Sequence, residues 1–209
     1  MIDETAQPIW LNEPKVWSVD TAAHRLVVLP DAETDFWQKT HYGFAADNGH
    51  FLYARVTGDF TLSSEVIFCP RHQYDQAGLM VRFSSDCWLK TSVEYEPEGS
   101  AKLGVVVTNG GYSDWSVEDF PLERNSVELR VRRAAGDFLV DYRESAGAEW
   151  NMIRMAHLAG VETEPALCGL YACSPKAAGF RAEFCSPKIA QPELRDFLHQ
   201  LNGLGIRVE

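Results

Sequence analysis

The chain has 209 residues and an apolar content of 45%, enough for one large core, and an all-β sandwich of this length is ordinarily a single domain. The formal net charge is -11 and no basic run occurs. We therefore expect neither nucleic acid nor an anionic membrane as a partner, because phosphate neutralisation needs clustered lysines and arginines. No stretch reaches the length of a transmembrane helix, and the N-terminus does not resemble a signal peptide. The five cysteines are irregularly spaced, so we expect reduced thiols in a cytoplasmic protein.

The first fifty residues contain short candidate strands and one long turn-rich segment. Trp10 and Trp17 are expected to pack an N-terminal strand onto a sheet, and residues 25–29 form a β-branched run that ends at Pro30. Residues 31–50 are polar and rich in turn formers, so we expect a loop that folds back over one sheet.

Clear alternation of apolar and polar residues begins after residue 50. Residues 51–56 and 60–68 are predicted strands, because a period of two is typical of a half-buried strand. The stretch 75–116 predicts three further strands of one antiparallel sheet and the start of a fourth. Its apolar residues fall on one face, which we expect to join a core, and Lys90 falls on the opposite face.

The C-terminal half continues this pattern. Residues 127–132 and 138–143 predict a hairpin whose outer face carries arginines and acids, and we expect these to form ion pairs on a solvent face. Residues 156–165 are expected to form a helical turn or a loop. Other strands are predicted at 149–155, 167–173 and 180–185.

The end of the chain has a different period. Residues 192–201 place four apolar side chains at helical spacing between a proline and a glycine, which predicts a short amphipathic helix. We predict one domain over residues 1–209, of which residues 190–209 form a helical appendage.

Roughly a dozen strands at this spacing indicate an all-β sandwich or barrel. The segments DQAGLMVRF, CWLKTSVEY, LGVVVTNGGYSDWS and CGLYACSP resemble an uncharacterised family of bacterial and fungal proteins with a concanavalin A-like fold, which includes a fungal protein named for regulation of enolase. The resemblance covers about residues 10–186. It implies a two-sheet jelly-roll sandwich with a concave face, whereas the fold shared with lectins and glucanases does not by itself assign a function.

Three glutamates at alternate positions, Glu94, Glu96 and Glu98, suggest glycosidase chemistry, which uses a pair of carboxyl groups. Retaining glucanases of the concanavalin A-like class carry a similar Glu-x-Asp-x-Glu pattern. Pro97 argues against the full motif, because proline occurs at strand ends. We expect Glu96 and Glu98 to be solvated turn residues and Glu94 to remain within a strand.

The candidate ligand site lies on the polar face of the predicted sheet. Trp88 supplies an indole for stacking, while Arg82, Lys90 and Glu94 supply directional hydrogen bonds. A structural alternative is a cross-strand ion pair on a wet sheet. The loop TNGGYSDWS is expected to form the rim of the site, or else a simple hairpin connection, and the rim residues are Asn109, Tyr112, Asp114 and Trp115.

Motifs for other chemistry do not occur. The histidines and cysteines lack metal-ligand spacing, and no nucleotide or nucleophile-elbow motif is present. A calcium ion held by loop carboxylates is an alternative that the sequence does not decide. We expect no catalytic residue, no metal and no cofactor.

The sequence therefore predicts noncatalytic binding of a carbohydrate or other polar small molecule on the concave face. In this hypothesis Trp88 or Trp115 stacks on the ligand, Lys90 and Arg82 donate to it, and Glu94 accepts hydroxyl protons. Two alternatives remain. One is a glycoside-active enzyme that uses Glu94 with a second carboxylate, and the other is a regulatory protein that binds a metabolic enzyme through residues 192–201.

Overall fold

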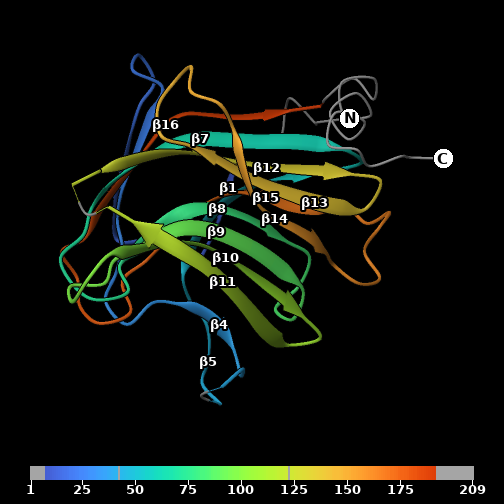
Figure 1. Ribbon diagram of the computed structural model, residues 1–209, viewed down its shortest axis with the longest axis horizontal. Helices are drawn as coiled ribbons and strands as arrows, with labels where there is room; N and C mark the ends of the chain where they lie inside the picture. Colours follow the sequence, from blue (N-terminus) through green and yellow to red (C-terminus); the bar gives the residue numbers. More distant parts are fainter. Residues whose placement is uncertain (1–7, 42, 122, 192–209) are drawn as a thin grey trace.

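The computed structural model describes residues 8–41, 43–121 and 123–191, which form strands joined by turns and contain no helix. Two seven-stranded antiparallel sheets face each other (Figure 1). In spatial order, sheet A contains β1 (Ile9–Leu11), β6 (His50–Val56), β15 (Ala166–Cys173), β8 (Gln76–Arg82), β9 (Trp88–Glu94), β10 (Ala101–Asn109) and β11 (Tyr112–Phe120). Sheet B contains β14 (Asn151–His157), β13 (Asp137–Arg143), β12 (Ser126–Ala134), β7 (Phe60–Cys69), β16 (Arg181–Ala190), β3 (Arg25–Leu29) and β2 (Val16–Asp20). The predicted two-sheet sandwich is confirmed, and the predicted helix at 192–201 lies outside the described residues.

The main core fills the space between the two sheets. Leu79 and Leu89 of sheet A meet Leu62 and Leu129 of sheet B, and none of these side chains has more than 1% of its surface exposed. These residues hold the inward positions of the alternation, which is why period-two patterning located the strands. Burial of this apolar surface is the main favourable term in folding.

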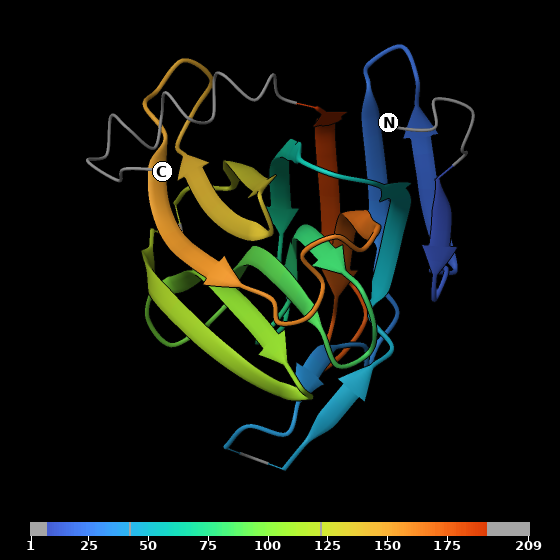
Figure 2. The same ribbon diagram turned by 90° about the vertical axis from the view of Figure 1, so that its right-hand side faces the viewer.

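A third layer covers the other face of sheet A, called here the outer face. It is the hairpin of β4 (Phe36–Gln38) and β5 (Ala45–Asp47), which lies beneath sheet A in Figures 1 and 2. The segment predicted as a loop that folds back over a sheet therefore does so as a two-stranded hairpin. The hairpin closes through the backbone N–H of Lys39, which donates to the carbonyl of Phe44 at 2.8 Å.

The hairpin creates a second, smaller core on the outer face. Phe36 packs there against Met80, Trp88 and Tyr171, and all four side chains are fully buried. Strand β8 is consequently buried on both faces along its whole length. A strand that is covered on both sides can bury large apolar residues on both faces, as Met80 is buried here opposite the main core positions.

The N-terminal segment divides between the two sheets. Trp10 belongs to β1 in sheet A and Trp17 to β2 in sheet B, where one N-terminal strand was predicted. Their ring centroids lie 5.5 Å apart, so this aromatic pair spans the edge of the sandwich.

The hairpin of β12 and β13 confirms the predicted ion pairs, since Asp141 contacts both Arg130 and Arg132. The prediction of solvent exposure is wrong for Arg132 and Asp141, which are buried. Trp150 covers this face, and its ring centroid lies 4.0 Å from the guanidinium carbon of Arg130.

All five cysteines are free thiols, and the described residues include no helix long and apolar enough to cross a membrane.

Candidate ligand-binding site

A pocket with a volume of about 360 Å³ lies on the outer face of sheet A. The sheet forms its floor, the β4–β5 hairpin forms one side, and the loops before β8 and after β15 complete the rim. Its lining residues are Asp35, Trp37, Phe44, Tyr74, Gln76, Lys90, Glu94, Val106, Trp115, Pro175 and Lys176. This size lies at the small end of the range of about 300–1,000 Å³ for small-molecule sites.

The floor of the pocket is a hydrogen-bonded network around Lys90. Its ammonium donates to the Gln76 side-chain oxygen at 2.8 Å and to the Phe36 carbonyl at 2.7 Å. Asp35 Oδ1 lies 3.6 Å from the same ammonium. Because the Lys90 side chain is almost fully buried, these oxygens replace the water that the charge would otherwise need.

This network fixes the orientation of the Gln76 amide. Its oxygen accepts from Lys90 and also from the Tyr171 hydroxyl, at 3.1 Å. The amide nitrogen must then face the other way, and it donates to Glu94 Oε2 at 3.1 Å. Gln76 therefore connects the ammonium of Lys90 to the carboxyl group of Glu94.

Burial raises the pKa of Glu94 from 4.5 to about 8, because the carboxylate loses much of its hydration in the pocket. The positive charge of Lys90 lowers this pKa, while the carboxyl groups of Asp35 and Glu96 raise it further. Glu94 is consequently a protonated carboxylic acid at neutral pH, and it can donate a hydrogen bond as well as accept one.

Aromatic side chains form the walls. Trp37 and Phe44 come from the hairpin, Tyr74 from the loop before β8, and Trp115 from β11. The Trp37 indole N–H donates to the Thr40 carbonyl at 3.2 Å, whereas the indole of Trp115 is 40% exposed. These rings offer apolar faces around a polar floor.

The loop before β8 has a strained and well-anchored backbone. Tyr74 has a φ of 72°, a left-handed conformation that is uncommon for a bulky residue and that is often found at functional sites. Asp75 holds the loop, since its Oδ2 accepts from the backbone N–H groups of Arg71 and His72, each at 2.8 Å.

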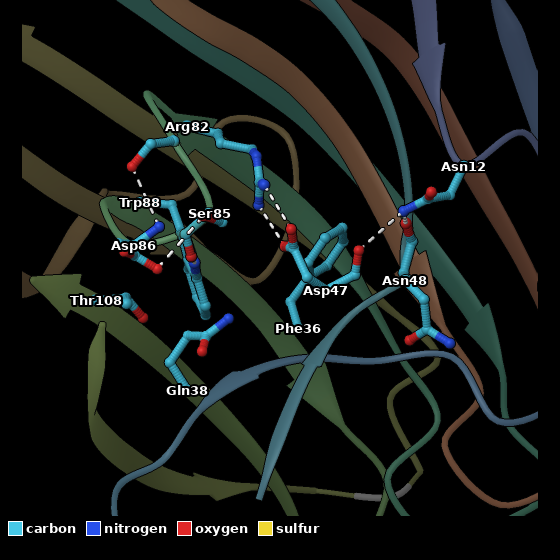
Figure 3. A network of polar contacts seen from close by, with 12 residues as sticks. Asn12, Phe36, Gln38, Asp47, Asn48, Arg82, Ser85, Asp86, Trp88 and Thr108 are labelled. Carbon is cyan, nitrogen blue, oxygen red and sulfur yellow. Dashed lines mark hydrogen bonds and ion pairs between the residues drawn. The ribbon is translucent and has the colours of Figure 1, made fainter. Parts of the chain in front are cut away.

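The hairpin is attached to sheet A by polar contacts. Arg82 of β8 forms two hydrogen bonds to Asp47 at the end of β5, at 2.6 and 2.7 Å, beside the ring of Phe36 (Figure 3). At its other end, the backbone N–H of Gln38 donates to the Ser113 hydroxyl at 2.9 Å. These contacts position the hairpin residues that line the pocket.

Of the eight ligand-binding residues predicted from the sequence, Lys90, Glu94 and Trp115 line the pocket. Trp88 requires a correction, because none of its surface is exposed. Its indole N–H donates to the Ser85 carbonyl at 3.0 Å, and its ring meets Phe36 edge-on. Trp88 therefore supports the hairpin and does not offer a face to a ligand.

The other four predicted residues lie outside the pocket. Arg82 is buried and paired with Asp47. Asn109 bonds the carbonyl of residue 157 and the N–H of residue 159, both at 3.0 Å. Asp114 pairs with Arg154 at 3.2 Å, and Tyr112 lies under the ammonium of Lys39. These four residues, which were predicted from the sequence to bind a ligand, contact other parts of the protein instead.

The glutamate tract behaves as predicted for Glu94 and Glu98, whereas Glu96 is half-buried and its Oε2 accepts from the Gln73 side chain at 2.8 Å. Strand β9 ends at Glu94, and Glu98 is exposed in the following turn. The second carboxyl group in the pocket comes instead from Asp35, in a segment predicted to be a loop. The sequence placed this segment over a sheet but did not assign Asp35 to the site, although it directly precedes Phe36 and Trp37, and adjacent large aromatics in a polar segment indicate a segment that packs.

The described residues contain no group of three or more histidine, cysteine, aspartate or glutamate side chains that could hold a metal ion.

Residues 10–192 match the model of a family described as "Protein of unknown function (DUF1349)". The chain belongs to this family. A relative of this DUF1349 protein is Regulation of enolase protein 1 from Saccharomyces cerevisiae, with 35% identity over 199 residues that cover 95% of this chain and 96% of the relative. The resemblance stated from the sequence motifs is thereby confirmed.

Solved structures agree with the fold of the DUF1349 protein. A functionally unknown protein from Saccharomyces cerevisiae has a TM-score of 0.82 at 33% identity, covering 90% of this chain and 97% of that one. The GH43 protein BlXynB from Bacillus licheniformis has a TM-score of 0.64 at 17% identity, covering 86% of this chain and 36% of that one. Xylan beta-1,4-xylosidase from Bacillus halodurans C-125 has a TM-score of 0.63 at 13% identity, covering 89% of this chain and 40% of that one. The two enzymes share the sandwich fold alone, because identity this low carries no functional assignment.

Proposed function

We propose that this DUF1349 protein binds a carbohydrate or another small polar molecule, without catalysis, in the pocket on the outer face of sheet A. The observation that carries the proposal is the combination of aromatic walls with a polar floor in one pocket. Sugars have apolar ring faces that stack on indoles and hydroxyl groups that need directional hydrogen bonds.

The roles follow from the contacts. Trp115 and Trp37 stack on the ligand from two walls, while Glu94 meets a ligand hydroxyl. Gln76 and Lys90 hold Glu94 in place and have little remaining capacity of their own, because their polar atoms already bond each other and the backbone. The pocket volume of about 360 Å³ suits a monosaccharide or disaccharide better than a polymer.

Calorimetric titration with mono- and disaccharides tests the proposal. We expect at least one of them to bind at millimolar concentration or below, and Trp115→Ala to weaken that binding by about tenfold or more, because the stacking face is lost. Trp17→Ala is the matched control, since Trp17 on β2 is 39% exposed, close to the 40% of Trp115, and lies outside the pocket. Absence of binding by every sugar, or equal losses in both variants, contradicts the proposal.

A second candidate function is glycoside hydrolysis, favoured by one observation. Asp35 and Glu94 both line the pocket, and a pair of carboxyl groups with unlike surroundings is the arrangement that glycosidases use. Glu94 would protonate the leaving oxygen, and Asp35 would accept the proton of the attacking water. Release of nitrophenol from aryl glycosides tests this function, and release that persists in both Glu94→Gln and Asp35→Asn excludes it.

A third candidate is a cytoplasmic regulatory role through a protein partner. It is supported by the name of the yeast relative, which refers to enolase, and by the exposed apolar residues Ile9, Val16 and Val19 on β1 and β2. Binding to purified enolase, compared between the whole chain and a chain that ends at Gln191, tests this role. Equal binding by both chains would exclude residues 192–209 as the contact.

A further inference from the structure

The charges of the side chains that line the pocket do not sum to zero. Asp35, Lys90, Glu94 and Lys176 line it, and the ammonium of Lys90 lies 3.6 Å from the carboxylate of Asp35. These two buried charges offset each other. The ligand therefore meets the remaining two groups, Glu94 and Lys176.

Within the part of the chain that the structure describes, one oxygen of Glu94 has no hydrogen-bond partner. Its Oε2 accepts from Gln76, whose amide cannot turn because its oxygen already accepts from Lys90 and Tyr171. The other oxygen, Oε1, remains for the ligand. With a pKa of about 8, the group carries a proton at neutral pH and adds no negative charge to the site.

Lys176 is an exposed cation at the rim. Its ammonium lies 5.1 Å from the centroid of the Tyr74 ring, and it forms no ion pair with the described residues. The ring holds the ammonium beside the pocket through a cation–π contact. Since Glu94 is neutral and Lys90 is offset by Asp35, Lys176 is the positive charge left without a compensating carboxylate among the residues that line the pocket, although the whole chain has a net charge of -11.

We propose that the pocket selects a sugar acid: a ligand of one or two sugar rings that carries a single carboxylate, which pairs with Lys176 while Glu94 donates a hydrogen bond to the ligand. This inference rests on the proposed binding function and specifies its ligand class. A neutral sugar would gain no ion pair with Lys176, whose exposed ammonium would stay hydrated. A ligand cation would meet Lys176 and a carboxyl group that carries no charge, so both are disfavoured.

Calorimetry with matched pairs of acids and neutral sugars tests the ligand class. The whole protein is titrated at pH 6.5 with glucuronate and glucose, galacturonate and galactose, and mannuronate and mannose. In at least one pair, the acid is expected to bind about tenfold or more tightly. Glucose 6-phosphate distinguishes the source of the charge, because tighter binding of this phosphate than of every uronate overturns the carboxylate assignment.

Two variants locate the charge. Lys176→Met is expected to weaken uronate binding by about tenfold and to reduce the difference in affinity between the acid and its neutral partner. Lys39→Met is the matched control, because Lys39 also lies over a tyrosine ring, at 5.5 Å from the centroid of Tyr112, but does not line the pocket. Equal effects of the two substitutions overturn the assignment of Lys176.

The pH dependence provides an independent readout. Glu94 is surrounded by Lys90, Asp35, Glu96 and Tyr171, and its deprotonation places a negative charge beside the bound acid. Uronate affinity is therefore expected to fall between pH 7 and 9, and Glu94→Gln is expected to abolish this fall, whatever affinity the variant has at pH 6.5. A fall that persists in Glu94→Gln overturns the role of Glu94.

The two levels of the hypothesis fail in different ways. If neither acids nor neutral sugars bind at millimolar concentration, the proposed binding function fails. If neutral sugars bind as tightly as their acids, binding stands and the selection of sugar acids is refuted.

Discussion

At the scale of single residues, Glu94 shows how neighbours determine chemistry. The carboxyl group that lines the pocket with it comes from Asp35, at the start of the hairpin, while Glu96 acts on its pKa from the chain after β9. Gln76 and Lys90 orient it. A glutamate on a wet strand would be ionised at neutral pH, whereas this one holds its proton because the pocket removes water from it.

The raised pKa of Glu94 predicts that stability is lost as the pH rises from 4.5 to about 8. Between 4.5 and about 8, the unfolded chain ionises this group while the folded chain keeps the proton. The free energy of unfolding therefore decreases through this window, by an amount on the order of a few kcal/mol. Urea denaturation at pH 5, 7 and 9 should show this decrease, and Glu94→Gln should reduce it.

Glu98→Gln is the control for this measurement. Glu98 is exposed in the turn after β9, so its replacement should leave the pH dependence of stability as in the wild type. A Glu94→Gln variant with the wild-type pH dependence would refute the assignment of a buried proton to Glu94.

At the scale of elements, the β4–β5 hairpin determines the site. Each of its strands has three residues, and a two-stranded hairpin is marginally stable by itself in water. It is held by Phe36 in the second core and by the ion pair of Arg82 with Asp47. The pocket therefore depends on contacts between the hairpin and sheet A.

Asp47→Asn should loosen the hairpin. The substitution leaves the buried guanidinium of Arg82 without its carboxylate, and because Asp47 itself is partly exposed we expect a loss of about 1–3 kcal/mol, below the cost for a fully buried pair. Amide hydrogen exchange at residues 36–47 should become faster, and ligand affinity should decrease. The control is Glu144→Gln, which removes the exposed pair with Arg124 and should cost little.

At the scale of the whole molecule, sheet A separates two cores. Leu79 faces sheet B in the main core, and Met80, the next residue, faces the hairpin in the second core. Both side chains are completely buried. The main core stabilises the sandwich as a unit, whereas the second core also supports the ligand pocket.

Adjacent substitutions should separate these two roles. Leu79→Ala and Met80→Ala should each lower the free energy of unfolding by about 2–5 kcal/mol, because each leaves a cavity. Met80→Ala alone should weaken ligand binding, since the hairpin rests on that core. Urea denaturation and calorimetry on both variants measure these effects, and equal effects on affinity would contradict the division into two cores.

Much of the fold could be predicted because strand patterning is local. Residues 60–68 showed their strand directly, and the apolar face of the stretch 75–116 was assigned correctly to a core. The hairpin was not predicted as strands, because three residues are too few for a period of two to be recognised.

By itself, the sequence determined which residues alternate, which face of each strand is apolar, and that Lys90, Glu94 and Trp115 belong to a polar region on one sheet. Only the tertiary structure decided what covers that face. The partners of Arg82, Lys90 and Gln76 lie 35, 54 and 95 residues away along the chain. Alternation indicates the direction of a side chain and not what meets it. For that reason Trp88 became a buried support, and Asp35 and Lys176 joined the site.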